Sequence, residues 1–310
     1  MKLRIFVEPQ QGASYLQQLK VAQRAEELGF DAFFRSDHCL RMGDGSPLPG
    51  PTDSWVTLGA IARETSTIRL GTLLTSATFR NPSVLAISVA QVDEMSNGRI
   101  ELGLGAGWFE AEHSAYGIEF PDTSERFDRL KEQLEIVTGL WKTKVGDSFS
   151  YSGKYFKLAN SPALPKPVSS PHPPIIIGGR GPKKTPALAG AFAQEYNVPF
   201  ASIEACKAQF DLVSLAATNS GRSPSDIINS VALVVCLGND SETLAKRASR
   251  IGRSIDDLTE NGLCGSANQI VEKISLYQEA GAERVYLQVL DFDDLDHLNE
   301  VSDGVKSQFV

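Results

Sequence analysis

Residues 98–108 read GRIELGLGAGW, and residues 175–181 read IIIGGRG. In each stretch a short apolar run ends in glycines, and such a run is typical of a parallel strand that is buried on both faces. An amphipathic stretch follows the first run, with apolar residues spaced to share one face of a helix. These residues are Phe127, Leu130, Leu134, Val137 and Leu140. A buried strand followed by an amphipathic helix is one βα unit.

About eight such units can be counted along the chain. Strands are expected at residues 4–8, 32–37, 68–75, 100–105, 175–177, 195–200, 231–237 and 285–290. Strands that alternate with helices favour a parallel sheet, and 310 residues suffice for one closed barrel of eight units. We therefore predict an α/β fold, a single (β/α)8 TIM barrel, with two small domains as the alternative.

The helices have recognisable ends and faces. One is expected at residues 53–65, and another is capped by Asn81 and runs from Pro82 to about Ser96. Ser266 and Gln269 predict a capping box before the last helix of the barrel. The buried face of the first helix is expected to carry Leu16, Leu19, Ala22, Ala25 and Leu28.

The segment around 143–174 departs from the repeating pattern. Residues 149–151 and 154–156, joined through Ser152 and Gly153, predict a small hairpin. The segment also carries six of the sixteen prolines, which favour turns. We interpret it as an insertion into one domain that covers residues 1–310, and not as a linker between domains.

Composition and charge exclude several classes of partner. Apolar residues make up 42% of the chain and charged residues 22%, which is ordinary for a globular protein with a large core. The formal net charge of −8 is spread along the sequence, so the basic surface of a nucleic-acid binder is missing. No apolar run approaches the roughly 20 residues that a membrane helix requires. We expect neither a nucleic-acid partner nor a membrane span.

The cysteines and histidines bear on metals and on the compartment. The four cysteines lie far apart without a C-x-x-C pair, and the N-terminal run MKLRIFVE predicts a strand instead of a signal peptide. Both observations favour free thiols in a reducing cytoplasm. The four histidines show no H-x-x-x-H or H-E-x-x-H spacing, so we expect no zinc site.

His38 is the first candidate for acid-base chemistry. The active site of an α/β barrel lies at the carboxyl ends of its strands, and His38 is the one histidine at a predicted strand end. Imidazole titrates near neutrality, with an ordinary pKa of about 6.5. The alternative is a structural histidine that hydrogen-bonds the barrel rim. Asp37 either orients His38 or caps the following loop.

Gly178, Gly179 and Arg180 form a candidate phosphate site. They follow directly on a buried strand, where free backbone N–H groups can face an anion and Arg180 or Lys183 can add positive charge. The alternative is an ordinary glycine turn. The glycines of residues 103–107 lack the G-x-G-x-x-G spacing of a dinucleotide fold, and close packing of strand and helix also accounts for them.

Three further groups of residues leave alternatives open. Trp55, Phe79 and Trp108 either face a flat ring system or fill the core, whereas Trp141 continues the apolar face of a helix. Cys39 has no adjacent base or helix start that would make it a nucleophile. The carboxylates on or near strands leave a paired-carboxylate site open, because sequence spacing does not reveal their separation in space. They are Glu8, Asp37 and Glu101.

Several motifs, in this order along nearly the whole chain, resemble the luciferase-like monooxygenase family. The motifs are LGFDA (28–32) with SDH (36–38), RLGT (69–72) with RNP (80–82), GR (98–99) with LGLGAGW (102–108), and IGG (177–179). The resemblance is closest to the branch that uses the deazaflavin coenzyme F420, since EYNVP (195–199) is similar to the strand-six pattern there. It implies the bacterial-luciferase-like form of the barrel.

The resemblance also implies roles for residues. His38 would lie beside the reactive edge of the deazaflavin or flavin ring. A cis peptide between Leu73 and Leu74, before Thr75 at the end of strand three, would back that ring. The remaining residues would line the cofactor cleft or hold its phosphate. They are Gly107, Glu112, Gly178, Gly179, Arg180 and Asn197.

Two departures from the family pattern limit what the resemblance implies. Residues 193–195 read AQE where many relatives have Ala-Asp-Gly, so the contacts made there are open. The lysine and arginine set that grips a sugar phosphate in the glucose-6-phosphate dehydrogenase branch has no counterpart that we can place. A sugar phosphate is therefore not the expected substrate.

Three functions follow from these observations. The leading one is an oxidoreductase that transfers a hydride between F420 and a small organic substrate. The second is a monooxygenase that uses O2 with reduced FMN supplied by a separate reductase. The third is a non-catalytic flavin-binding protein on the same scaffold, since a fold does not by itself confer activity. The resemblance also implies a homodimer.

Overall fold

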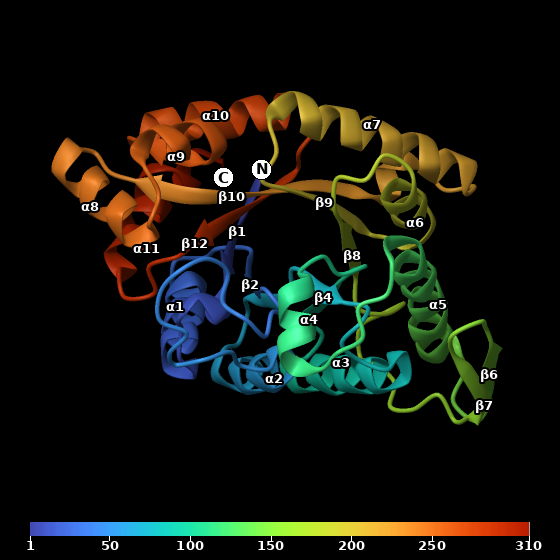
Figure 1. The fold of residues 1–310 in the computed structure, drawn as a ribbon. Helices are drawn as coiled ribbons and strands as arrows, with labels where there is room; N and C mark the ends of the chain where they lie inside the picture. The colour runs from blue at the N-terminus through green and yellow to red at the C-terminus, as the bar shows by residue number, and fades with distance from the viewer. Residues whose placement is uncertain (310) are drawn as a thin grey trace.

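Eight parallel strands form a closed barrel in the computed structural model, which describes residues 1–309 (Figure 1). Each strand pairs with the next around the ring, and the pairing of β9 with β10 closes it. The strands are β1 (Lys2–Val7), β2 (Ala32–Arg35), β3 (Arg69–Thr72), β5 (Ile100–Gly105), β8 (Ile175–Gly178), β9 (Glu195–Pro199), β10 (Ile228–Leu237) and β12 (Arg284–Val289). The predicted (β/α)8 barrel is confirmed.

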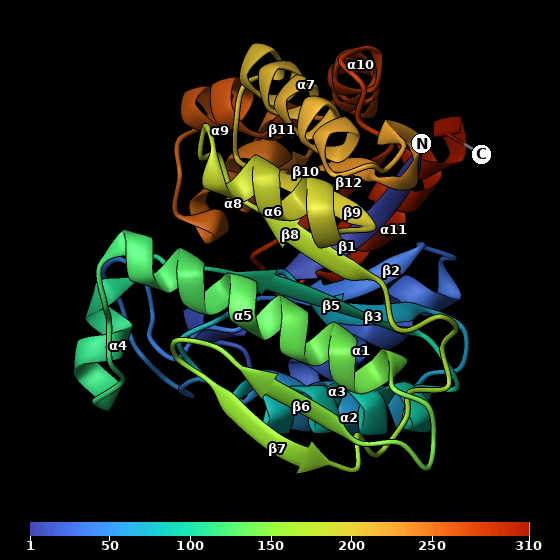
Figure 2. The same ribbon diagram turned by 90° about the vertical axis from the view of Figure 1, so that its right-hand side faces the viewer.

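Helices surround the barrel, as the two views at right angles show (Figures 1 and 2). They are α1 (Tyr15–Glu27), α2 (Ser54–Glu64), α3 (Pro82–Ser96), α5 (Thr123–Lys142), α6 (Lys184–Phe192), α7 (Ile203–Asn219), α10 (Ala267–Glu279) and α11 (Leu295–Gly304). Additional helices are α4 (Glu110–Tyr116), α8 (Ser241–Ile251) and α9 (Ile255–Asn261), with short 3-10 turns at Pro9–Gln11, Pro224–Asp226 and Lys306–Phe309. Within the described part of the chain, none of these helices has the length and apolarity needed to cross a bilayer.

The predicted helix ends are confirmed. The side chain of Asp53 accepts hydrogen bonds from the backbone N–H groups of Trp55 and Val56, and Asn81 accepts one from Ser83. Ser266 and Gln269 form the expected capping box. One detail of the first helix is wrong, because Leu16 is 63% exposed. The buried face of α1 carries Gln18, Val21, Ala22 and Ala25.

Three features depart from the expected pattern by more than the position of a strand end. The strand expected at residues 68–75 is broken: β3 ends at Thr72, and a two-residue strand, β4 (Thr75–Ser76), continues against β5. The hairpin is present as β6 (Phe149–Ser152) and β7 (Lys157–Ser161), but its second arm begins later than expected. It lies outside the ring of helices beside α5 (Figure 2). A further strand, β11 (Leu263–Gly265), was not foreseen and pairs with the end of β10.

The amino ends of the strands are joined by a buried charge network. Arg4 has no exposed surface and donates to Glu101 (2.7 Å), to Asp31 (2.7 Å) and to the hydroxyl of Tyr286 (2.9 Å). Burial opposes the charge of Glu101, but Arg4 lowers its pKa to about 2. Charged groups at this end of a barrel serve stability. Glu101 therefore belongs to this network, and the possible carboxylate pair with Asp37 is ruled out.

Glycines on β5 and β8 make room for the segment that breaks the third strand. A Cβ on Gly103 would overlap the carbonyl oxygen of Thr72 and would lie 2.8 Å from the Leu74 side chain. A Cβ on Gly178 would lie 2.9 Å from the same leucine. Real Cβ atoms essentially never approach another heavy atom so closely, so Leu74 can occupy this space only because both positions are glycine.

The substitution Gly103→Ala tests this packing. It should destabilise the protein by about 3 kcal/mol, because the added methyl group meets backbone that cannot move aside. Gly59→Ala is the matched control: Gly59 lies inside α2, where a Cβ has no neighbour closer than 3.5 Å, and alanine favours a helix. Urea unfolding of the two variants measures the difference. Equal stability of Gly103→Ala and wild type would show that the segment shifts freely.

Candidate active site

His38 and Glu112 form a pair at the carboxyl end of the barrel. His38 follows β2, and its Nδ1 lies 2.9 Å from one oxygen of Glu112 and 3.1 Å from the other. Glu112 lies on α4 with a side chain that is 1% exposed, and it also accepts the backbone N–H of Cys39 (2.9 Å). One carboxylate thus orients both the imidazole and the backbone beside it. Among residues 1–309, Nε2 of His38 has no hydrogen-bond partner, which leaves it available to a ligand.

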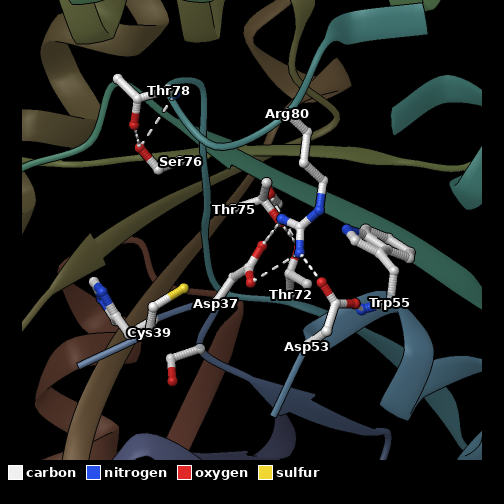
Figure 3. A network of polar contacts seen from close by, with 12 residues as sticks. Asp37, Cys39, Asp53, Trp55, Thr72, Thr75, Ser76, Thr78 and Arg80 are labelled. Atoms are coloured by element: carbon white, nitrogen blue, oxygen red, sulfur yellow. Dashed lines mark hydrogen bonds and ion pairs between the residues drawn. The ribbon is translucent and has the colours of Figure 1, made fainter. Parts of the chain in front are cut away.

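Asp37 contacts Arg80 (Figure 3) and makes no hydrogen bond to His38 within the described residues. Arg80 donates to both carboxylate oxygens of Asp37 and also to Asp53 (2.6 Å). Thr75 on β4 donates to Asp37 as well (2.9 Å). The expectation that Asp37 orients His38 is therefore corrected, because Glu112 does so. Asp37 instead ties the end of β2 to β4 and, through Arg80, to the N-terminus of α2.

Glu8 is a further acidic side chain at this end of the barrel. It follows β1, and burial raises its pKa above the ordinary value, while the nearby His38, Gln10 and Gln288 act in the opposite direction. Gln10 is 1% exposed, and its amide nitrogen has no hydrogen-bond partner in the described chain. The sequence marked Glu8 only as a carboxylate near a strand end, and nothing in it placed this residue beside His38.

The Leu73–Leu74 peptide is cis, as the resemblance implies. It lies between β3 and β4, and Leu73 packs in the barrel interior with Phe34 and Ile176. Gly107, after β5, has a positive φ of 82°, and a Cβ there would overlap the hydroxyl of Ser76. The chain can turn this closely past β4 only because the residue is glycine.

A hydrogen-bonded chain that the sequence analysis missed continues from Ser76. The hydroxyls of Ser76 and Thr78 are 2.6 Å apart, and Thr78 is 2.6 Å from Nε2 of His113. The other ring nitrogen of His113 bonds the carbonyl oxygen of Phe109 (2.8 Å). This buried histidine fixes α4, the helix that carries Glu112, against the β4 segment. No spacing in the sequence indicates that these residues meet.

The candidate phosphate site lies between β8 and α6. Gly179 has a φ of 135°, and its N–H donates to the carbonyl oxygen of Asn197 (3.1 Å). The expectation that this amide is free to face an anion is therefore wrong. The first turn of α6 is free instead, because the side chain of Lys183 at its N-cap makes no capping hydrogen bond. Unbonded N–H groups at a helix N-terminus favour an anion.

Arg180 adds an exposed positive charge to the same loop. Its guanidinium donates to the carbonyl oxygen of Phe200 (3.2 Å), and within residues 1–309 neither Arg180 nor Lys183 forms a salt bridge. Asn197 lies beside this loop, buried on β9, where its amide donates to Ser230 (3.0 Å). Two unpaired cations and an uncapped helix N-terminus fit the phosphate of a flavin or deazaflavin coenzyme.

The aromatic candidates divide between core and surface. Trp55 and Trp141 are 4% and 5% exposed, so the packing role predicted for Trp141 is confirmed. Trp108 is 65% exposed and lies beside His38, with ring centroids 5.7 Å apart. Phe79 packs against His113. Among residues 1–309, no three His, Cys, Asp or Glu side chains gather as they would around a metal ion.

Residues 1–256 match the profile described as luciferase-like monooxygenase. The chain belongs to this family. A relative from Mycobacterium tuberculosis, named F420-dependent hydroxymycolic acid dehydrogenase, is 31% identical over 75% of this chain and 61% of its own length. Another, from Microbacterium testaceum, is named F420-dependent glucose-6-phosphate dehydrogenase and is 38% identical over 56% of this chain. The chain matches only 49% of that relative's length, and thus spans about half of it.

Solved structures share the fold of this family member. A structure described as an F420-dependent secondary alcohol dehydrogenase in complex with an F420-acetone adduct is similar with a TM-score of 0.86 and 22% identity, over 99% of this chain and 98% of the other. The coenzyme F420 dependent tetrahydromethanopterin reductase from Methanopyrus kandleri has a TM-score of 0.83 and 19% identity, over 100% and 99% of the two chains. At this identity the similarity establishes the fold alone.

Cys39 should react slowly despite its place beside His38. Burial, together with nearby Asp37 and Glu112, raises its pKa from 9.0 to about 11. Each pKa unit lowers the thiolate fraction tenfold, so alkylation by iodoacetamide at pH 7.5 should be about 100-fold slower than for an ordinary thiol, and should speed up as the pH rises towards 11. Mass spectrometry of the Cys39 peptide measures the rate, with urea-unfolded protein as the control. Equal rates in folded and unfolded protein at pH 7.5 would contradict the assignment.

Proposed function

We propose that this protein is an oxidoreductase that transfers a hydride between the deazaflavin coenzyme F420 and a small organic substrate. The observation that carries the proposal is the arrangement at one end of the barrel. It combines an oriented histidine with a free Nε2, a glycine-lined Leu73–Leu74 segment and an unpaired cationic loop at a helix N-terminus. Relatives whose names specify F420 support the same cofactor.

The cofactor is held at two places in this proposal. Leu73, Leu74 and Thr75 form the floor under its ring, and Gly107, which turns closely past Ser76, lines the cleft beside that floor. Gly178, Gly179 and Arg180 hold the phosphate together with the first turn of α6, and Asn197 lines the same loop. When bound, F420 supplies a two-electron carrier that accepts or donates a hydride at C5 of its ring. The protein supplies orientation, exclusion of water and proton transfer.

His38 is the proposed catalytic acid-base residue. Its Nδ1 is held by Glu112, so Nε2 is the atom that faces a substrate oxygen, taking its proton when an alcohol is oxidised and returning it in the reverse direction. Glu112 is the positioning residue, since it holds the ring through Nδ1. Asp37 acts indirectly through Thr75, which it anchors at the cofactor floor.

The second candidate is an FMN-dependent monooxygenase. A relative from Pseudomonas putida named FMNH(2)-dependent dimethylsulfone monooxygenase is 26% identical over 76% of this chain, which favours this reading. In that case the same loop would hold the phosphate of FMN, and a separate reductase would supply reduced cofactor. A non-catalytic flavin-binding protein is the third candidate, and the His38–Glu112 pair argues against it.

The proposed partners are a small-molecule substrate and a second copy of the chain. Val56 on α2 and Val84 and Ile87 on α3 are 76%, 56% and 45% exposed, and α2 packs against α3, so these helices offer an apolar surface for a homodimer. We place the protein in the cytoplasm, in accordance with its free thiols. The insertion at 143–174 and the barrel together form one domain in this proposal.

Cofactor titrations test the proposal. The protein should bind F420 at micromolar or lower concentration and FMN much more weakly, as measured by fluorescence with each cofactor oxidised and reduced. Arg180→Ala should weaken F420 binding about tenfold or more, because a hydrogen bond to a charged group contributes about 1.5–3 kcal/mol. His38→Ala should lower turnover about 100-fold or more, with little effect on affinity.

Arg63→Ala is the matched control for Arg180→Ala. Arg63 is also exposed, also lacks an acidic partner within residues 1–309, and donates to one carbonyl oxygen at the same distance, 3.2 Å. It should bind F420 like wild type. Tight binding of reduced FMN alone would move the assignment to the monooxygenase, and binding of neither cofactor would overturn both.

A further inference from the structure

Trp108 is held beside the catalytic histidine with its ring exposed. It is 65% exposed, whereas the other two tryptophans are buried. Its ring stacks on Phe109, with centroids 5.3 Å apart and planes at 26°, and meets the imidazole of His38 edge-on at 78°. Gly107, the residue before Trp108, makes a tight turn against Ser76. The helix α4 begins at Glu110, two residues after Trp108. The exposed ring therefore has a defined position.

The indole ring of Trp108 lies close to the imidazole of His38, which we expect to bind the substrate. Glu112 occupies Nδ1 of His38, so a substrate oxygen binds at the free Nε2. A group attached to the carbon that bears this oxygen is within reach of Trp108, because the centroids of the two rings are 5.7 Å apart. Among the aromatic rings of residues 1–309, Trp108 pairs with those of His38 and Phe109. Trp108 thus forms a wall on the substrate side of the site.

The chemistry of this wall selects a class of substrate. An indole face attracts flat apolar groups, and an aromatic pair contributes about 0.5–1.5 kcal/mol beyond the burial of its area. Glu112 is paired with His38, and within residues 1–309 no Lys or Arg side chain lies over the Trp108 ring. The wall therefore offers an anionic group no positively charged partner.

We propose that Trp108, backed by Phe109, is a specificity-determining residue that selects alcohols or carbonyl compounds with an aromatic or other flat apolar substituent. This inference rests on the proposed oxidoreductase function and narrows its substrate class.

The inference can be tested without turnover by comparing the affinities of acetone and acetophenone, in which a phenyl group replaces one methyl group of acetone. Acetophenone and acetone cannot be reduced while F420 is oxidised, so calorimetry with the protein saturated in oxidised F420 reports affinity alone. Wild type should bind acetophenone at least about tenfold more tightly than acetone. Trp108→Ala should lose this preference, and Trp108→Phe should keep most of it. The matching substrates, 1-phenylethanol and propan-2-ol, should show the same pattern in kcat/KM.

Tyr116→Ala is the control, since Tyr116 is another exposed aromatic residue of α4, 53% exposed at its far end. It should retain the wild-type preference for acetophenone. A preference that survives in Trp108→Ala, or its absence in wild type, would overturn the inference. Weaker F420 binding by Trp108→Ala would also overturn it, because Trp108 would then contact the cofactor.

Failure of the proposed function is recognised separately. In that case wild type binds no F420, and the acetophenone titration is repeated with FMN-saturated protein. A preference that depends on Trp108 there would support the aromatic wall with the other cofactor. No preference there would overturn the wall as well.

Discussion

The carbonyl oxygen of Thr72 and the side chain of Leu74 occupy the space that a side chain on Gly103 would fill. Two neighbouring strands of the barrel can approach this closely only because β5 carries no Cβ at that point. The close approach lets the third strand break after Thr72 and resume as β4 against the end of β5. Thr75 then meets Asp37, and Ser76 meets Gly107, so the polar contacts around the site depend on this one packing constraint.

The two ends of the barrel use charge differently. At the amino ends of the strands, Arg4 has no exposure and is surrounded by acidic partners, which holds the strands together. At the carboxyl ends, the charged groups leave atoms available to ligands: Nε2 of His38, the guanidinium of Arg180 and the first turn of α6. This division is the usual one in α/β barrels, where stability and chemistry lie at opposite ends.

Sequence patterns predicted the barrel and most of its helix ends, because strand periodicity and capping residues are local signals. The resemblance also placed the cis peptide at Leu73–Leu74 correctly. The partner of His38 could not be derived from the residues, since Glu112 lies 74 positions away and reaches it through a helix that has no strong periodic pattern. Asp37, the sequence neighbour of His38, points to Arg80 instead. Successive residues after a strand face different ways, so adjacency along the chain did not mean contact.

At the candidate phosphate site, the partners of the backbone N–H groups could not be predicted from the sequence either. Two glycines after a buried strand predicted free amides, but the closed barrel brings Asn197 on β9 alongside, and its carbonyl oxygen takes the N–H of Gly179. The free backbone N–H groups are found instead at the start of α6, where the N-cap residue, Lys183, provides no capping hydrogen bond. Such pairing depends on the neighbouring strand, which no pattern within residues 175–181 specifies.

A crystal structure of the protein grown with oxidised F420 tests the central claim most directly. The account predicts electron density for the ring against Leu73 and Leu74, beside His38, with the phosphate bound by Arg180 and the first turn of α6. Density for the cofactor at another place, such as the pocket at the amino ends of the strands lined by Lys2, Gln278 and Arg284, would contradict it.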